Sequence, residues 1–282
     1  MVSVKELKSV DLSSFTIVTT AIGVLFSIIS SILIVIMMGV TTPSAIGASI
    51  YIISTVIVGT LMYTIYNSFC QGFLYNTLAK KINPIKLAFD GNKIIKVTTT
   101  ETAIAIAMIE TVMVILLYLA SVVIMPLMIN AAVQTLMYSG QQVLAYGLYQ
   151  FMLLISQPAT IAMIIFGTFI MTFVFVLLGC YIYNILAGRG RCVEVELSQE
   201  NNMTVIESID YLKFAIVFAI INGILSIISA IVMIVSGGQA VNAILNIVLS
   251  FVIGFVFGAL TAIFYNFIAP KLEKLKLELI DL

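Results

Sequence analysis

The chain has 282 residues, of which 62% are hydrophobic and 9% are charged, and its mean hydropathy is +1.20. A soluble domain carries roughly 25% charged residues, so this composition predicts an integral membrane protein. The formal net charge is zero, and the chain contains no His and no Trp. These counts argue against a basic nucleic-acid-binding surface, a His-ligated metal and imidazole acid–base chemistry. We expect no nucleic acid partner, no metal and no cofactor.

Six segments are apolar enough and long enough to cross a bilayer, which takes about 20 predominantly apolar residues. The first exceeds the roughly 7–15 apolar residues of a signal peptide, so we expect a retained span. Together they predict an all-α integral membrane fold of three tandem helical hairpins. The segments are residues 13–38, 48–79, 102–128, 158–187, 213–236 and 241–269.

All 13 Lys and Arg residues lie at one end of these hairpins, whereas the opposite turns, such as residues 137–142, carry no charge. Lys and Arg in short loops favour the cytoplasmic side of a membrane. We therefore expect a multi-pass protein of the cell membrane with both termini in the cytoplasm. The cations are Lys5, Lys8, Lys80, Lys81, Lys86, Lys93, Lys96, Arg189, Arg191, Lys213, Lys271, Lys274 and Lys276.

A short motif, Tyr-Asn-x-[Leu/Ile]-Ala, ends the second span of each hairpin, at residues 75–79, 183–187 and 265–269. Each copy is followed, after five linking residues, by five residues that alternate between apolar and polar. This period of two is typical of a half-buried strand, and such short strands are not stable alone. We expect them to gather as one small cytoplasmic sheet. Pairing with another protein at the strand edges, or lying on the bilayer surface, are open alternatives. The alternating segments are residues 85–89, 193–197 and 275–279.

The first spans repeat as well, because an offset of 199 residues (208 − 9) maps Ser9-Val10-Asp11 onto Ser208-Ile209-Asp210. Thr99-Thr100-Glu101 stands at the corresponding place in the middle of the chain. We therefore predict three tandem repeats around a pseudo-threefold axis, in residues 1–94, 95–203 and 204–282. The middle hairpin is longer, and its uncharged residues 127–158 are expected to project from the membrane or lie along its outer interface. A seventh span there is the alternative.

Asp11 and Asp210 are expected to be helix N-caps. At a rise of 1.5 Å per residue, the Tyr-Asn pairs reach the same depth as these caps. We predict a clasp at the cytoplasmic interface, in which the Asn amide or Tyr hydroxyl bonds the capping carboxylate or its neighbouring backbone. An ordinary belt of interfacial Tyr residues is the alternative. The candidates are Asp11, Tyr75, Asn76, Glu101, Tyr183, Asn184, Asp210, Tyr265 and Asn266.

Small residues spaced by four recur on the predicted spans, and such faces let helix backbones approach closely. We expect tight hairpins, with homo-oligomer formation through the last pair as an alternative. The residues are Ser27, Ser31, Ser226, Ala230, Gly254 and Gly258.

Glu110 is an acidic residue well inside a predicted span, where a carboxyl group is costly. Two interpretations stay open: a neutral, hydrogen-bonded or interface-reaching carboxyl, and an ion or proton site. Cys70, Cys180 and Cys192 show no C-x-x-C spacing and are expected to be unpaired thiols.

The Ser-x-Asp start, the two spans and the Tyr-Asn-x-[Leu/Ile]-Ala end with its alternating tail resemble a family of prokaryotic two-span transmembrane domains of unknown function. That family is best known in actinobacteria and has archaeal relatives. Its members carry a comparable ending with Gly-Gly on a single hairpin, where this chain has Asn83-Pro84, Arg191-Cys192 and Glu273-Lys274. The resemblance recurs once per repeat over nearly the whole chain. It implies a fused form of three such units, and no substrate or reaction.

No nucleophile–base pair, phosphate-binding Gly-rich loop or metal-ligand cluster is visible in the sequence, so we expect no enzymatic activity. The predicted function is a membrane scaffold or complex organiser, with the lipid bilayer and proteins at the cytoplasmic strands as partners. One alternative is a channel or transporter along the pseudo-threefold axis. Another is an accessory subunit whose partners bind the strand edges. A pore would be lined by residues such as Ser27, Glu110, Asn222, Asn242 and Asn246.

Overall fold

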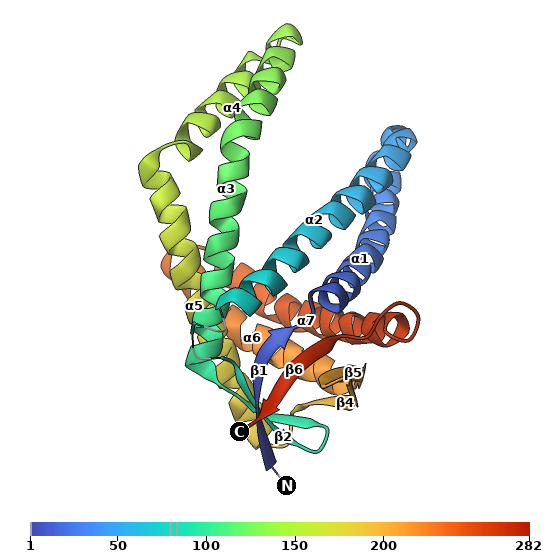
Figure 1. The fold of residues 1–282 in the computed structure, drawn as a ribbon. Helices are drawn as coiled ribbons and strands as arrows, with labels where there is room; N and C mark the ends of the chain where they lie inside the picture. The colour runs from blue at the N-terminus through green and yellow to red at the C-terminus, as the bar shows by residue number, and fades with distance from the viewer. Residues whose placement is uncertain (1, 79–80, 83) are drawn as a thin grey trace. The chain divides into compact units, whose positions relative to one another are not determined.

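The computed structural model describes residues 2–78, 81–82 and 84–282, so Ala79 of the first motif, Lys80 and Asn83 lie outside the described residues. The helices are α1 (Leu12–Thr41), a short 3₁₀ turn η1 (Pro43–Ala48), α2 (Ser49–Leu78), α3 (Thr99–Tyr138), α4 (Gln142–Ile155), α5 (Pro158–Gly188), α6 (Tyr211–Val235) and α7 (Ala240–Ile268). The strands are β1 (Val2–Val10), β2 (Lys86–Asp90), β3 (Lys93–Val97), β4 (Val193–Glu200), β5 (Met203–Ile209) and β6 (Lys276–Asp281), and Figure 1 labels most of these elements.

The chain divides into two compact units. One unit comprises Met1–Ala105 and Leu177–Leu282, and it contains the six strands, the α1–α2 and α6–α7 hairpins, and the strand-proximal ends of α3 and α5. The other unit is Ile106–Val176, which holds the rest of α3 and α5 together with α4.

The prediction of six long apolar helices is confirmed, with mean hydropathies between 1.6 and 2.7 over their most apolar stretches. The α3 helix runs past the predicted end of its span and through Pro126 to reach 40 residues, or about 60 Å. Residues 127–158 are therefore helical for most of their length. The α4 helix has 14 residues, which is shorter than the about 20 residues that a span requires. For residues 127–158 the structure thus favours an extension of α3 and a short α4 over a seventh span.

The predicted helical membrane fold with short strand segments is confirmed in part, because the chain is mostly helical but six strands, not three, form a closed antiparallel barrel in the order β1-β2-β3-β4-β5-β6. The three alternating segments lie in β2, β4 and β6, and they do gather in one sheet. The strands that precede each hairpin, β1, β3 and β5, were not predicted. Register shifts at Leu7/Ser9 and Glu196/Leu197 break the simple alternation in β1 and in the β4–β5 pair.

Strand pairing follows one rule around the barrel. The two strands that flank each helical segment pair with each other, as β1 with β2, β3 with β4 and β5 with β6. Strands that are consecutive without a helix between them also pair, as β2 with β3 and β4 with β5. Pairing of β6 with β1 closes the ring, so every described strand has two neighbours.

Apolar side chains on three of the strands are buried. Phe89 of β2, Val195 of β4 and Val205 of β5 are 4%, 6% and 1% exposed. An eight-stranded barrel is just wide enough for side chains to fill it, and a six-stranded ring is narrower. The barrel is therefore a small packed core.

The α6–α7 hairpin is packed through small residues. A Cβ atom added to Gly254 would lie 3.2 Å from the Cα atom of Ala219, and one added to Gly258 would lie 3.1 Å from the Cα atom of Ala215. The predicted Gly254/Gly258 face therefore contacts α6 of its own hairpin. Since this face is already covered, a homodimer formed through it would have to displace α6.

Candidate functional site: the helix–barrel junctions

The Tyr-Asn pair at the end of α2 joins the first hairpin to the barrel. Asn76 accepts a hydrogen bond from the backbone N–H of Val10 at 2.8 Å and donates one from its side-chain amide to the carbonyl oxygen of Val10 at 2.8 Å. The Tyr75 hydroxyl donates to the carbonyl oxygen of Leu7 at 2.8 Å. Both residues thus bind the end of β1, directly before α1. We call this arrangement a junction.

The end of α5 forms the same junction with β3. Asn184 accepts from the backbone N–H of Val97 and donates to its carbonyl oxygen, both at 2.8 Å. The Tyr183 hydroxyl donates to the carbonyl oxygen of Ile94. The spacing between the two backbone partners, 94 and 97, equals the spacing between 7 and 10 in the first junction.

The end of α7 forms the third junction with β5. Asn266 accepts from the backbone N–H of Ile209 at 2.9 Å and donates to its carbonyl oxygen at 2.8 Å. The Tyr265 hydroxyl donates to the carbonyl oxygen of Ile206. Three pairs of side chains therefore make the same bonds at the same spacing in three places.

Two of the Tyr hydroxyls also bond the chain at the start of the strand that follows their own helix. The hydroxyls of Tyr183 and Tyr265 accept from the backbone N–H groups of Val193 and Leu275, each at 3.3 Å. A single buried hydroxyl thus links the strand before a hairpin to the strand after it. Apolar side chains surround these Tyr residues: Val217, Ala187 and Cys192 at Tyr183, and Val18 and Ala269 at Tyr265.

The predicted N-caps are present, and their carboxylates bind their own helices. Asp11 accepts from the backbone N–H of Ser14 at 2.8 Å, and Asp210 accepts from that of Lys213 at 3.0 Å. The Asn and Tyr side chains bond the neighbouring backbone instead of these carboxylates. This is the backbone form of the predicted clasp.

The backbone of each cap residue ties its helix to the strand that follows a different hairpin. Asp11 donates its N–H to the carbonyl oxygen of Lys276, and Asp210 donates to that of Glu194, each at 3.0 Å. In the middle of the chain Thr98 occupies this place and donates to the carbonyl oxygen of Lys86 at 3.0 Å. Each hairpin is therefore bonded to its neighbour as well as to its own strands.

Glu101 does not take part in the middle junction, because Asn184 bonds Val97 and the cap position belongs to Thr98. Glu101 lies in the first turn of α3. Thr99-Thr100-Glu101 stands in the sequence where the other hairpins begin with Ser-x-Asp, but the residue that takes the place of the Asp caps is Thr98.

Backbone groups of Val10, Val97 and Ile209 are the partners that the sequence reasoning did not specify. Any residue type supplies an N–H and a carbonyl there, so side-chain chemistry carried no signal. Ser14 was also missed; its hydroxyl accepts from the backbone N–H of Lys276 at 3.1 Å.

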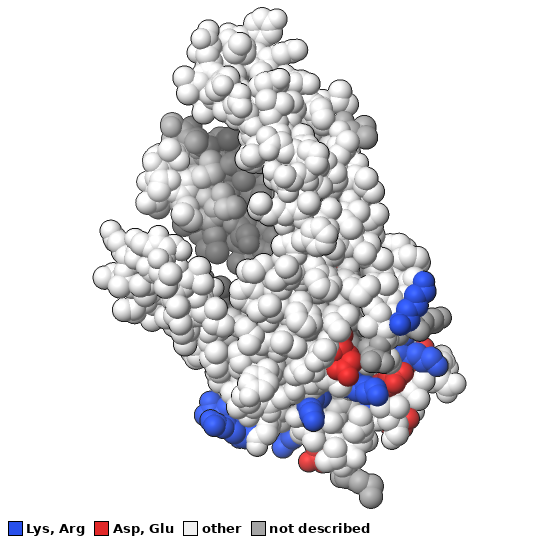
Figure 2. All heavy atoms as spheres, turned by 90° about the vertical axis from the view of Figure 1, so that its left-hand side faces the viewer, with Lys and Arg blue, Asp and Glu red and all other residues white. Residues whose placement is uncertain are grey.

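Charged side chains gather around the barrel, as Figure 2 shows for one face of the molecule. Lys274 and Ser198 donate hydrogen bonds to Glu207, and these bonds lower the pKa of its carboxyl group below the usual value. A hydrogen bond from Lys213 likewise lowers the pKa of Glu194.

The remaining predicted residues lie away from the junctions. Ser27, Ser31, Ser226 and Ala230 are buried on α1 and α6. Glu110 is half-buried on α3, in the unit formed by residues 106–176. The three cysteines are free thiols. Within the described residues, no group of His, Cys, Asp or Glu is arranged to hold a metal ion.

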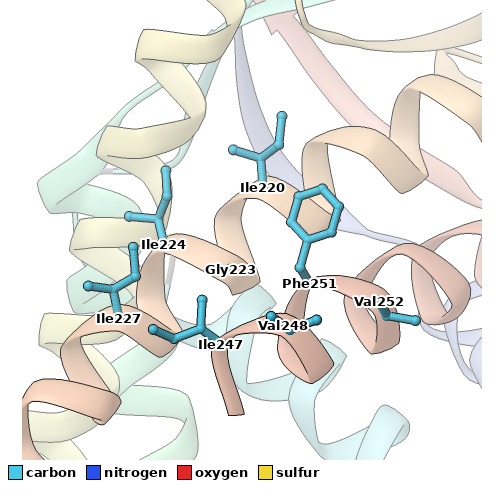
Figure 3. A pocket seen from close by; sticks show the side chains of 8 residues that line it. All are labelled: Ile220, Gly223, Ile224, Ile227, Ile247, Val248, Phe251 and Val252. Atoms are coloured by element: carbon cyan, nitrogen blue, oxygen red, sulfur yellow. The ribbon is translucent and has the colours of Figure 1, made fainter. Parts of the chain in front are cut away.

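An apolar pocket of about 410 Å³ lies between α6 and α7 (Figure 3). Its lining differs from the hydrogen-bonded junctions in being entirely apolar. Because Gly223 has no side chain, the Phe251 ring can pack close to its backbone. A Cβ atom at Gly223 would lie 3.1 Å from the Phe251 ring. The labelled side chains are all aliphatic or aromatic, so this pocket offers no group for acid–base or nucleophilic chemistry. Its lining is Ile220, Gly223, Ile224, Ile227, Ile247, Val248, Phe251 and Val252.

Comparison of the chain with protein-family models, with curated proteins and with solved structures gave no match.

Proposed function

We propose that this protein is a non-catalytic membrane scaffold, in which a packed cytoplasmic barrel holds three two-helix units in fixed register. The observation that carries the proposal is the recurrence of one junction at Asn76, Asn184 and Asn266, with identical backbone bonding. Such recurrence supports three tandem repeats around a pseudo-threefold axis, as heterologous contacts between like units close into a ring. It also supports the resemblance to two-span transmembrane domains, of which this chain would be a fused form.

The placement in the membrane rests on length, hydropathy and charge. Six helices are long and apolar enough to span a bilayer. Of the charged residues that the structure describes, Glu110 alone lies well within a long helix; the others occupy strands, turns or the helix ends beside them. Because Lys and Arg in short loops favour the cytoplasm, the barrel and both termini are assigned to the cytoplasmic face.

A scaffold is favoured over a conduit by what fills the barrel and by where the polar residues lie. Phe89, Val195 and Val205 of the strands are buried, which supports a barrel packed with side chains. Asn222 packs against Gly254 between α6 and α7 and donates to the carbonyl oxygen of Phe218. Asn246 is exposed on α7. These polar groups supply no shared pathway within the unit that contains the barrel.

Partners of such a scaffold would meet the outer face of the barrel, because the closed ring leaves the described strands without a free edge for strand addition. Lys8 of β1 and Lys96 of β3 are exposed there, whereas the Lys5 side chain is only 18% exposed and pairs with Asp281. The exposed lysines are therefore suitable reporters of a bound protein.

The test is affinity purification from cell membranes in mild detergent, after treatment with a lysine-reactive cross-linker. We expect at least one membrane protein in a constant ratio to the scaffold, cross-linked through Lys8 or Lys96. The variant Lys8→Gln/Lys96→Gln should lose these cross-links while the protein still co-purifies, which controls for random capture. A pure, partnerless product from both cross-linked and untreated membranes would contradict the proposed function.

A further inference from the structure

We propose that the groove between α1, α2 and α7 is a binding site for an anionic phospholipid of the cytoplasmic leaflet, with Lys271 binding the phosphate. The proposal rests on the membrane placement assigned above. It goes further by naming a ligand class and the residues that select it.

The groove has the dimensions of a lipid chain. Its volume is about 700 Å³, and its lining runs along α1 from Thr16 to Leu25, with Leu61 and Ile65 of α2 at the far end. Nine residues of helix correspond to about 14 Å, which is close to half of the about 30 Å hydrocarbon thickness. An acyl chain entering at the barrel end would therefore end near the middle of the bilayer.

A single cation stands at the barrel end of the groove. Lys271 follows α7, and its ammonium group lies 3.2 Å from the centre of the Phe267 ring. Both residues line the groove. No ion pair joins Lys271 to another described residue, so its charge is available to a phosphate. Lysine binds phosphate as a point charge, and basic residues beside a span recognise anionic lipids.

Two hydroxyl groups lie between the cation and the apolar end. The Oγ1 atoms of Thr16 and Thr20 are buried without a hydrogen-bond partner among the described residues, and Thr20 is 8% exposed. Both residues line the groove, one helical turn apart. Buried hydroxyls without partners are costly, and a rotation about χ1 would direct them toward the ester carbonyls of a lipid. The order of cation, hydroxyl and aliphatic residues matches the order of phosphate, ester and chain in a phospholipid.

The chain contains a matched control for Lys271. Lys81 stands six residues after Tyr75, as Lys271 stands six residues after Tyr265 (75 + 6 and 265 + 6). Lys81 is exposed and is not among the residues that line this groove. The two lysines therefore occupy the same position after a Tyr-Asn pair, but only Lys271 lines the groove.

The test is lipid titration of the purified full chain in detergent, followed by native mass spectrometry. Phosphatidylglycerol and phosphatidylcholine with the same acyl chains are compared. We expect phosphatidylglycerol to bind about fivefold more tightly, as one basic residue near the membrane contributes about that factor. Lys271→Gln should remove the preference, and Lys81→Gln should keep it. Val24→Trp, which fills the groove, should weaken binding of both lipids.

Three results would overturn the site: equal binding of the two lipids by the unmodified chain, an unchanged preference in Lys271→Gln, or full displacement of the lipid by millimolar inorganic phosphate, which would indicate a site for free phosphate. No binding of either lipid would count against the membrane placement itself. The titration uses the chain alone, so its outcome is independent of whether a protein partner is recovered.

Discussion

At the scale of single residues, the Asn side chain of each junction acts as a substitute strand partner. Its amide has a donor group and an acceptor group, and in all three junctions both groups are bonded to the backbone of one residue. Asp lacks the donor and Leu lacks both groups. The identity of the side chain is therefore set by hydrogen bonding, and its loss would leave backbone groups unpaired.

We expect Asn266→Leu to lower the thermal stability of the protein in detergent. The substitution leaves the N–H and carbonyl groups of Ile209 without their partners, and each unsatisfied group costs about 1–3 kcal/mol. The measurement is the midpoint of thermal unfolding by circular dichroism. Asn246→Leu, on the exposed face of the same helix, should change the midpoint little. Equal midpoints for the two variants would show that the junction contributes no stability.

Glu207 provides a prediction for pH. Hydrogen bonds from Lys274 and Ser198 hold its pKa in the folded protein below the usual value, whereas in the unfolded chain it should titrate near its ordinary pKa of about 4.3. A lowered pKa stabilises the folded state above the unfolded pKa, and this stabilisation is lost as pH falls through the folded pKa. The difference in unfolding midpoint between the native chain and Glu207→Gln should therefore be constant near pH 6 and should shrink below about pH 4. Because the pair is exposed, salt should reduce the difference. A difference that grows toward acid pH would contradict the assignment.

At the scale of elements, close helix packing replaces the hydrophobic effect, which does not drive helix association within lipid. The α6–α7 hairpin brings backbone within 3.2 Å of the positions where Gly254 and Gly258 would carry a Cβ atom. Phe26 of α1 stacks on Phe257 of α7 at a centroid distance of 4.7 Å, and Phe218 of α6 lies 5.9 Å from the same ring. The α1–α2 and α6–α7 hairpins thus meet through aromatic rings above their junctions.

Gly258→Ala should destabilise the α6–α7 hairpin, because its Cβ atom would lie 3.0 Å from the Cβ atom of Phe218 and 3.1 Å from the Ala215 backbone. Gly59→Ala is the control, since a Cβ atom at this helical position meets nothing within 4 Å. Alanine is favoured over glycine within a helix by about 1 kcal/mol, so the control should be neutral or stabilising. Thermal unfolding of both variants in one detergent would test this, and a Gly258→Ala midpoint at or above that of Gly59→Ala would refute it.

How far the elements could be predicted depended on whether their signal was local. The six helices follow from long apolar segments, and β2, β4 and β6 follow from strict alternation. The β3 strand reads Lys-Ile-Ile-Lys-Val and alternates poorly, and the β1 strand is interrupted by an irregular register. Closure of the barrel depends on pairing residues 5–10 with residues 277–281, and no local pattern in either segment reveals such a distant partner. The Tyr-Asn pairs were identifiable because they recur, but their backbone partners were not.

At the scale of the whole molecule, six apolar helices, a closed barrel and three like junctions are linked by hydrogen bonds. The strands before and after each helical segment pair with each other, and the cap backbone of each hairpin bonds the strand that follows a different hairpin. Loosening one junction should therefore also weaken its neighbour. The combined variant Asn184→Leu/Asn266→Leu tests this coupling.

Its unfolding midpoint should fall by an amount different from the sum of the two single changes, because neighbouring sites that share partners are not additive. A double-mutant cycle measures the difference. Strict additivity would indicate that the junctions stabilise their hairpins separately and that the barrel does not couple them.

The central claim, a scaffold whose barrel is packed and not a conduit, is tested most directly by ion flux through the full chain reconstituted in liposomes. We expect flux of monovalent cations, anions and protons to equal that of protein-free vesicles, while an added ionophore shows that the vesicles hold a gradient. Flux that rises with the amount of protein, and that changes when the buried residue Phe89 of β2 is replaced by Ala, would contradict this claim.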